Sequence, residues 1–331
     1  MYPLFGDGSR AMCGGTLIDS TTIVTAAHCF FRTEQGTSAK AIGVEVILGA
    51  HNRTDHRVEK EFYDGVDMKS VVIHTGYDEN DDIALVFLNE KVSWSEFPNI
   101  RPACLPHSHA TQEEYVGKYA VATGWGYIDE DGPPSDVLQE VKVMVYNRAM
   151  CVNRYNLSRK HRLLDPKTIC AGTLRGGHDT CYGREENKKL FFQQHIYTGD
   201  SGGPLVVKNK TFEAYEVIGL TKGGEGCGAR NRPGLYTSIV NYLPWIKKNR
   251  DQYSSFANQQ QQEEEQIPSH IIKTSFSGPN LTTGHLWPDG EVPLRIESSF
   301  SAEQMKNITS ALEDISAAVP CIHFRFRLVH Y

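Results

Sequence analysis

Three short motifs contain the residue types that cleave amide bonds by nucleophilic catalysis. His28 lies in TAAHC, Asp82 begins DIAL, and Ser201 lies in GDSGGP. Amide hydrolysis near neutral pH needs a nucleophile, a base that deprotonates it, and donors for the developing oxyanion. We therefore predict Ser201 as the nucleophile, His28 as the base and Asp82 as the buried carboxylate that orients the imidazole. The alternatives are a structural histidine, the interpretation we give to the other twelve histidines, and a turn role for Asp82.

In the order His, Asp, Ser, these motifs resemble those of the trypsin/chymotrypsin-like serine proteases over roughly residues 10–249. The resemblance implies an all-β fold of two six-stranded antiparallel β-barrels with a C-terminal helix. The active site then lies in the cleft between the barrels. The resemblance also implies that the backbone N–H groups of Gly199 and Ser201 form the oxyanion hole.

The same resemblance implies where a substrate side chain binds. Asp179 is expected at the floor of the pocket, and Gly224 and Gly234 stand where its walls need small residues. A desolvated carboxylate favours cleavage after Arg or Lys, because burying it without a cation is costly. The expected partners are proteins or peptides with Arg or Lys at the cleavage site, and protein inhibitors of proteases. The alternative is that Asp179 is an exposed loop acid.

The eight cysteines favour disulfides over a metal site, because no C-x2-C pair occurs among them. Cys104 resembles the cysteine that tethers the propeptide, and we expect it to be free because that segment is missing. By resemblance, the predicted disulfides are Cys13–Cys29, Cys151–Cys170 and Cys181–Cys227.

The elements that would position these residues are short. Between about Val44 and Thr237, apolar runs alternate with clusters of Gly, Pro, Asn and Asp. This pattern predicts the strands of an all-β barrel or sandwich. The segment Tyr242–Arg250 predicts one closing helix. Residues 251–279 are predicted to be a polar linker, since they offer too little apolar surface to offset the entropy of ordering.

Residues 280–331 are predicted to be an incomplete second unit, a short α+β fragment. A strand at Val292–Ile296, a helix that begins at Ser301 and a strand near Cys321–Arg325 resemble the start of an astacin-like zinc metalloprotease domain. The zinc site of that family is an HExxH helix, and no His-Glu pair occurs in this chain. We therefore predict no metal site and no cofactor. The alternative is an unrelated extension with amphipathic patterning.

Charge and hydropathy exclude some partners. A net charge of −6 without a long basic block gives no reason to expect nucleic acid. No apolar run approaches the roughly 18 residues of a membrane span, and the first residues lack a secretory signal. We therefore expect no membrane partner. We nevertheless favour an extracellular, secreted protein, because of the disulfides and of sequons at Asn52, Asn156, Asn209, Asn280 and Asn307.

Three departures from the family pattern bear on activity. The domain at residues 1–250 lacks the family's N-terminal strand and propeptide, so Asp200 is expected to lack the ammonium that pairs with it in relatives. Residues 183–198 form an insertion directly before Gly199. Lys222 and Gly223 stand where the family has Ser and Trp, which predicts looser substrate binding.

The prediction is a secreted trypsin-like serine endopeptidase followed by an incomplete astacin-like fragment. One alternative is a catalytically impaired protease-fold module that binds proteins. Another is an incomplete gene product of a tandem serine protease and astacin metalloprotease.

Overall fold

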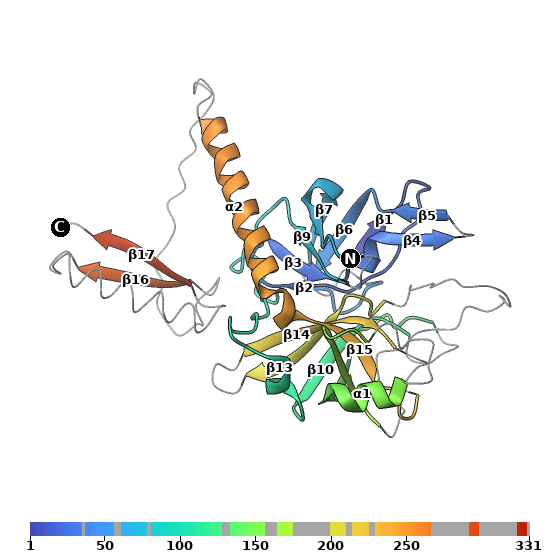
Figure 1. Cartoon of the computed structure of the whole chain (residues 1–331). Helices are drawn as coiled ribbons and strands as arrows, with labels where there is room; N and C mark the ends of the chain where they lie inside the picture. Colours follow the sequence, from blue (N-terminus) through green and yellow to red (C-terminus); the bar gives the residue numbers. More distant parts are fainter. Residues whose placement is uncertain are drawn as a thin grey trace.

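Two β-rich halves and a long helix make up most of the described chain (Figure 1). The first half runs to about residue 100, and the second contains the strands from Tyr119 onward. The computed structural model describes residues 1–34, 37–55, 61–77, 81–127, 133–155, 164–174, 199–209, 214–224, 229–265, 291–297 and 323–329.

The second half is a closed barrel of six antiparallel strands, as predicted. Alternate residues of its strands point inward, as the two-residue period of a strand requires. Ala120 and Ala122, for example, are buried against Leu205 and Ile218. Helix α1 (Arg148–Tyr155) connects two of the strands. Around the barrel the order is β10 (Tyr119–Gly124), β11 (Gln139–Tyr146), β12 (Thr168–Gly172), β15 (Gly234–Ser238), β14 (Ala214–Gly223) and β13 (Pro204–Asn209).

The first half consists of open sheets in the described residues, so the predicted second barrel is not confirmed. One sheet has the order β2 (Thr16–Leu17), β3 (Thr22–Thr25), β9 (Ala84–Phe87) and β8 (Val71–Ile73). Another has the order β1 (Tyr2–Leu4), β6 (Gly43–Leu48) and β7 (Phe62–Asp67), and β4 (Phe31–Glu34) pairs with β5 (Thr37–Lys40).

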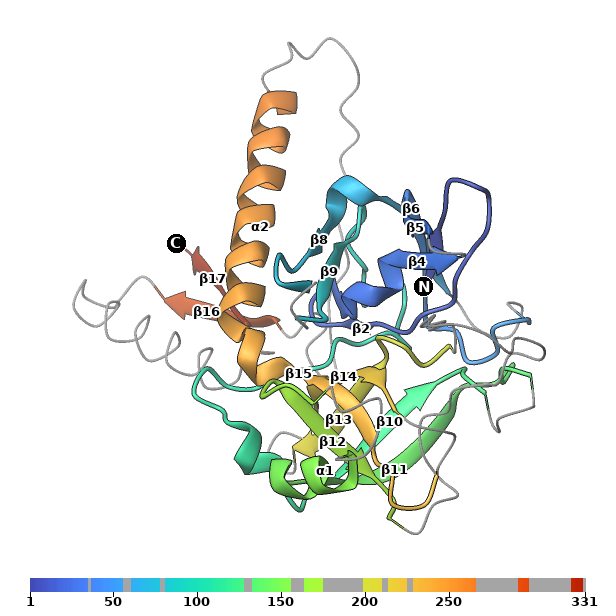
Figure 2. The same ribbon diagram turned by 45° about the vertical axis from the view of Figure 1, so that its right-hand side comes forward.

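The two halves share a buried apolar core, which fixes their relative position. Val24 and Leu85 from the first half pack with Leu220 of the barrel and with Ile246 of helix α2 (Leu243–Glu265). In both ribbon views α2 begins at the barrel and runs up past the first half (Figures 1 and 2). The junction between the halves is therefore a packed interface, and residues on either side of it can meet in one site.

Helix α2 is longer than predicted. We placed its end at Arg250, and it continues to Glu265, into the segment predicted as a linker. The Tyr253 ring stacks on Phe87 with 4.0 Å between centroids, which holds the helix against the first half. From there to Glu265 the sequence contains no Gly or Pro and is rich in Gln and Glu, which favour helix. A polar composition does not exclude a helix, because a helix forms its own backbone hydrogen bonds without burying apolar surface.

Near the end of the chain, β16 (Glu291–Glu297) pairs in parallel with β17 (His323–Val329). Both lie at or close to the predicted strands. The predicted helix that begins at Ser301 lies outside the described residues. Parallel strands need a long crossover connection, and the residues between these two supply its length.

Candidate active site

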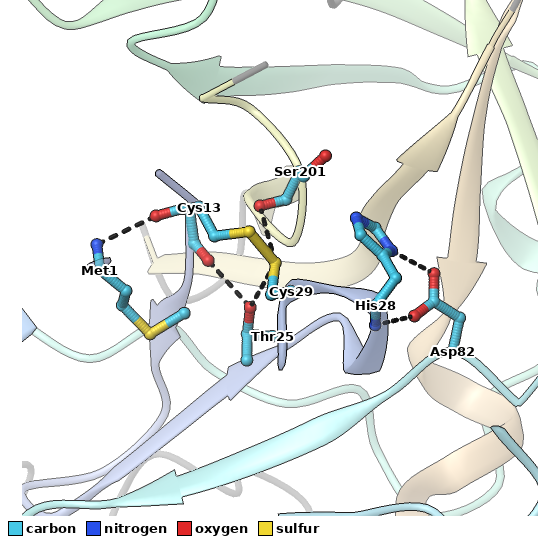
Figure 3. Close-up of a disulfide and its surroundings, with 8 residues drawn as sticks. Met1, Cys13, Thr25, His28, Cys29, Asp82 and Ser201 are labelled. Carbon is cyan, nitrogen blue, oxygen red and sulfur yellow. Dashed lines mark hydrogen bonds and ion pairs between the residues drawn. A yellow bond between two sulfur atoms is a disulfide. The ribbon is translucent and has the colours of Figure 1, made fainter. Parts of the chain in front are cut away.

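His28 and Asp82 meet because their strands are neighbours. His28 follows β3, Asp82 precedes β9, and Thr25 pairs with Ala84 in the antiparallel register of these strands. The Asp82 carboxylate accepts two hydrogen bonds from His28: the backbone N–H at 2.9 Å to Oδ1 and ring Nδ1 at 2.7 Å to Oδ2 (Figure 3). Both side chains are buried. The chain thus holds the imidazole at two points on one carboxylate.

The electrostatics of this pair favour an ionised Asp82. Burial by itself raises the pKa of Asp82, but the charge and hydrogen bonds of His28, with a contribution from Lys222, outweigh it and hold the pKa below its usual value. An ionised carboxylate can only accept hydrogen bonds, so Nδ1 of His28 carries the proton. In a neutral imidazole Nε2 then has a lone pair. Nε2 is buried and has no hydrogen-bond partner in the described part of the chain.

Ser201 is held next to this pair by its backbone. Its carbonyl oxygen accepts a hydrogen bond from Gly14 N at 2.7 Å and lies 3.6 Å from Sγ of Cys29, the residue after His28. The flanking Gly199 and Gly202 have φ angles of 71° and 74°, a region that side chains disfavour. The serine is therefore positioned by a glycine-rich turn packed on the disulfide beside the histidine.

The link between Ser201 and His28 is not formed in this structure. Ser201 Oγ is buried and, among the described residues, has no hydrogen-bond partner. In Figure 3 the imidazole lies between Asp82 and Ser201, and a dashed line joins it to Asp82 but not to Ser201. The catalytic roles of Ser201, His28 and Asp82 therefore stay predictions, supported by one of the two hydrogen bonds that they require.

The predicted oxyanion donors lie on the same turn. Within the described residues, neither Gly199 N–H nor Ser201 N–H donates a hydrogen bond, whereas Gly202 N–H and Gly203 N–H both do. Asp200, expected to lack its ammonium partner, accepts a hydrogen bond from Gly126 N at 2.8 Å. This bond ties the turn to the loop that follows β10.

Two of the three predicted substrate-binding residues lie among the described residues. Asp179 lies outside the described residues. Gly224 directly follows β14, and Gly234 is buried at the start of β15. Gly224 thus follows one strand of the barrel and Gly234 begins the neighbouring strand, and their role in binding stays a prediction.

Two predicted disulfides are confirmed, Cys13–Cys29 and Cys151–Cys170. The third, Cys181–Cys227, lies outside the described residues. The prediction that Cys104 is free is wrong, because Cys104 is disulfide-bonded to a partner that is not among the described residues. The chain's eight cysteines offer Cys104 partners other than the propeptide tether that we expected.

Sequence reasoning missed a group of charged residues behind the His28–Asp82 pair. The Lys222 ammonium donates to Asp165 at 2.5 Å, with only 4% of the Lys222 side chain exposed. Asp81 accepts hydrogen bonds from Lys167 and, at 2.8 Å, from Tyr242. A single lysine at the end of the apolar run of β14 was the available signal. From the sequence, this lysine predicts only looser substrate binding.

The fold and the site together define the class of protein. The model of the Trypsin family matches residues 3–184 and 188–246. The chain therefore belongs to the trypsin family of serine proteases.

Individual relatives agree with this assignment. The chain is 32% identical over 240 residues to coagulation factor XI from Bos taurus, covering 72% of this chain and 33% of the relative. It is 32% identical over 244 residues to trypsin eta from Drosophila melanogaster, covering 73% and 78%. It is 29% identical over 249 residues to the clotting factor G beta subunit from Tachypleus tridentatus, covering 72% and 71%. The chain thus spans about a third of the first relative and over two thirds of the other two.

Of the helices in the described part, none is long and apolar enough to cross a membrane. No group of three His, Cys, Asp or Glu side chains that could hold a metal ion occurs among the described residues.

Proposed function

We propose that the chain is a secreted serine endopeptidase that hydrolyses peptide bonds after Arg or Lys through Ser201, His28 and Asp82. The buried hydrogen bond between His28 Nδ1 and Asp82 Oδ2 carries this proposal. It fixes the tautomer in which Nε2 can accept a proton. Ser201 is the nearby hydroxyl that this nitrogen would deprotonate.

In the proposed reaction, Ser201 Oγ passes its proton to His28 Nε2 and attacks the scissile carbonyl carbon. Asp82 stabilises the imidazolium, which then protonates the leaving amine. Water hydrolyses the resulting acyl-enzyme with His28 again as the base. The N–H groups of Gly199 and Ser201 donate to the oxyanion. In this proposal a change of the Ser201 side-chain rotamer turns Oγ toward Nε2, since serine populates several staggered positions.

The proposed specificity and location rest on other observations. Asp179 and the small residues Gly224 and Gly234 support cleavage after Arg or Lys through the family resemblance. Two disulfides fit an oxidising compartment, and two relatives are named as clotting or coagulation factors. Both observations support secretion, with protein substrates and protein inhibitors as partners.

A fluorophosphonate probe tests the proposed nucleophile directly. The folded, disulfide-bonded chain should be labelled, and Ser201→Ala should abolish labelling. Peptide amides with Arg or Lys before the scissile bond should be cleaved faster than matched peptides with Leu or Asp. Asp179→Ser should remove that preference while labelling persists. A folded chain that neither labels nor cleaves would reject the proposal.

A second candidate function is binding without catalysis. It is favoured by the absence, in the described residues, of a hydrogen bond between Ser201 Oγ and His28 Nε2. This candidate predicts that protein inhibitors of trypsin-like enzymes bind equally well to the chain and to Ser201→Ala, with no turnover by either. Amidase activity above that of Ser201→Ala would exclude it.

Residues 280–331 are proposed to be the N-terminal part of an astacin-like domain. The parallel pairing of β16 with β17 supports the strand–helix–strand order on which this proposal rests. Without an HExxH helix it would hold no catalytic zinc. Elemental analysis of the purified chain should find no zinc, and stoichiometric zinc would contradict this view.

A further inference from the structure

Cys104 is a buried cysteine whose backbone joins the two halves of the protein. Its N–H donates to Tyr215 O at 2.8 Å, as part of a parallel bridge between Cys104 and Glu216 of β14. The preceding residue, Ala103, donates its N–H to Leu17 O of the first half at 2.8 Å. Cys104 therefore has a fixed place beside Glu216, and the reach of the chain decides which disulfide partners are possible.

Three cysteines remain as possible partners of Cys104. Cys104 is disulfide-bonded, and its partner is not among the described residues. The other described cysteines pair with each other, as Cys13–Cys29 and Cys151–Cys170. The candidates that are left among the eight cysteines are Cys181, Cys227 and Cys321. The Cα atoms of a disulfide are at most about 7 Å apart, so a partner must come within that distance.

Strands β14 and β15 lead away from the bridge at Glu216. A strand rises about 3.3 Å per residue, so Gly223, at the end of β14, lies about 23 Å along the strand from Glu216. Gly223 pairs with Leu235 of the antiparallel β15, so the chain before Leu235 continues outward in the same direction. There Asn231 donates its N–H to Leu174 O at 3.2 Å. Asn231 and Leu174 thus lie roughly 35 Å from the bridge along the strand direction.

Two of the three candidates are confined to that distant end. Ala229 O accepts a hydrogen bond from Arg232 N at 3.0 Å. Cys227 is two residues before Ala229 and at most about 7 Å from it, which leaves Cys227 well outside disulfide distance of the bridge. Cys181 is seven residues after Leu174, a span of at most about 25 Å, so it ends roughly 10 Å short of the bridge. These two cysteines can pair with each other, because their segments leave from neighbouring places.

The chain beyond α2 is long enough to bring Cys321 back to Cys104. Leu105 packs against the same apolar core as Leu243, the first residue of α2, so the helix begins near Cys104. The 23 residues of α2 rise about 35 Å. The segment from Glu265, where α2 ends, to the start of β16 can span up to about 90 Å, which is more than the length of the helix. Cys321 stands two residues before β17, the partner strand of β16.

We propose that Cys104 and Cys321 form a disulfide that fastens β16 and β17 to the barrel. The attachment point adjoins Tyr215, which is 51% exposed. The turn that carries Ser201 contacts β14 at Thr221, nearer the other end of the strand, so the fastened segment lies away from the candidate site. The occupant of this surface is thus a part of the same chain.

Formation of this bond joins two sulfur atoms and removes two protons and two electrons. A glutathione or protein disulfide takes them up and is reduced to two thiols. Because a disulfide survives cleavage of the backbone, a cut between α2 and β16 would leave two chains that stay joined until a reductant is added. The inference does not depend on the proposed function.

Peptide mapping without reduction decides the pairing, because the four cysteines fall in four different tryptic peptides. After alkylation and removal of N-glycans, trypsin should release residues 92–118, which contain Cys104, joined to residues 307–325, which contain Cys321. Residues 176–184 and 223–230, which contain Cys181 and Cys227, should be joined to each other. Before digestion, the full-length chain should run as a monomer on a gel without reductant.

Two variants check the assignment by thiol labelling. Cys321→Ser should leave Cys104 as a free thiol that iodoacetamide labels in the denatured chain. Cys181→Ser is the matched control, since it should free Cys227 and leave Cys104 unlabelled. A peptide that joins Cys104 to Cys181 or Cys227, an unpaired Cys104 in the parent, or a disulfide-linked dimer would each overturn the inference. None of these readouts needs catalysis, so failure of the proposed function is recognised separately.

Discussion

The two sides of the candidate site are held by different kinds of contact. His28 is fixed through its ring and its backbone to one buried carboxylate, Asp82, supplied by the adjacent strand. Ser201 is fixed only through its backbone, by Gly14 and by contact with Cys29, and its hydroxyl has no partner among the described residues. Pairing of adjacent strands therefore holds the base in place, whereas the position of the nucleophile depends on the conformation of a turn.

The largest effect is expected on the histidine side. Asp82→Asn should lower kcat by about 10⁴-fold, as is known for this family, because the amide favours the wrong tautomer of His28. Asp81→Asn is the matched control, since Asp81 binds Lys167 and Tyr242 rather than His28. Its rate should fall by less than about 10-fold. Equal losses in steady-state assays of the two variants would show that the His28–Asp82 bond has no special role.

On the serine side, substitutions in the turn that carries Ser201 should cause the largest loss of stability. A Cβ at Gly202 would lie 2.3 Å from Thr25 Oγ1, at a φ of +74°. Gly202→Ala should therefore cost about 3 kcal/mol or more of unfolding free energy. Gly117 has a φ of +79° but nothing within 4 Å of such a Cβ, so Gly117→Ala should cost only about 1 kcal/mol. Urea unfolding of both variants measures the difference, and equal costs would mean that the turn can relax.

Variants that lack one or the other disulfide distinguish an effect on stability from an effect on the position of Ser201. The cysteines of Cys13–Cys29 and of Cys151–Cys170 are 16 and 19 residues apart. Replacing both cysteines of either disulfide by Ala should therefore lower the free energy of unfolding by a similar amount, roughly 2–4 kcal/mol. Only the first contacts Ser201 and follows His28. Loss of Cys13–Cys29 should lower fluorophosphonate labelling well below that of the Cys151–Cys170 variant at a temperature where both are folded. Equal labelling would show that the turn does not need this support.

The smallest expected effect is the pH dependence of stability. The folded pKa of Asp82 lies below its unfolded value, because His28 outweighs the cost of burial. Its contribution to stability is therefore present above the unfolded pKa and is lost as pH falls through the folded one. The difference in unfolding free energy between the parent and Asp82→Asn should narrow as pH falls below about 4. A difference that stays constant with pH would show that Asp82 is not ionised in the native state.

Most of what sequence reasoning achieved came from local motifs. TAAHC and DIAL predicted the meeting of His28 with Asp82, and the family resemblance of the cysteines predicted two disulfides that are confirmed. The prediction for Cys104 failed because disulfide partners are chosen by proximity in the fold. The end of α2 was misplaced because polar composition does not distinguish a solvated helix from a linker. The family resemblance supplied the barrel of the second half, whereas the first half is described as open sheets.

The sequence by itself determined the chemical groups and the family, because the residues around His28, Asp82 and Ser201 are short contiguous motifs. Only the tertiary structure decided which charges share the buried space behind them. Lys222 and Asp165 are 57 residues apart in the chain and meet because β14 bulges where the segment before β12 passes. The physical reason is that the strength of an electrostatic interaction depends on distance and burial, which the order of residues along a chain does not fix.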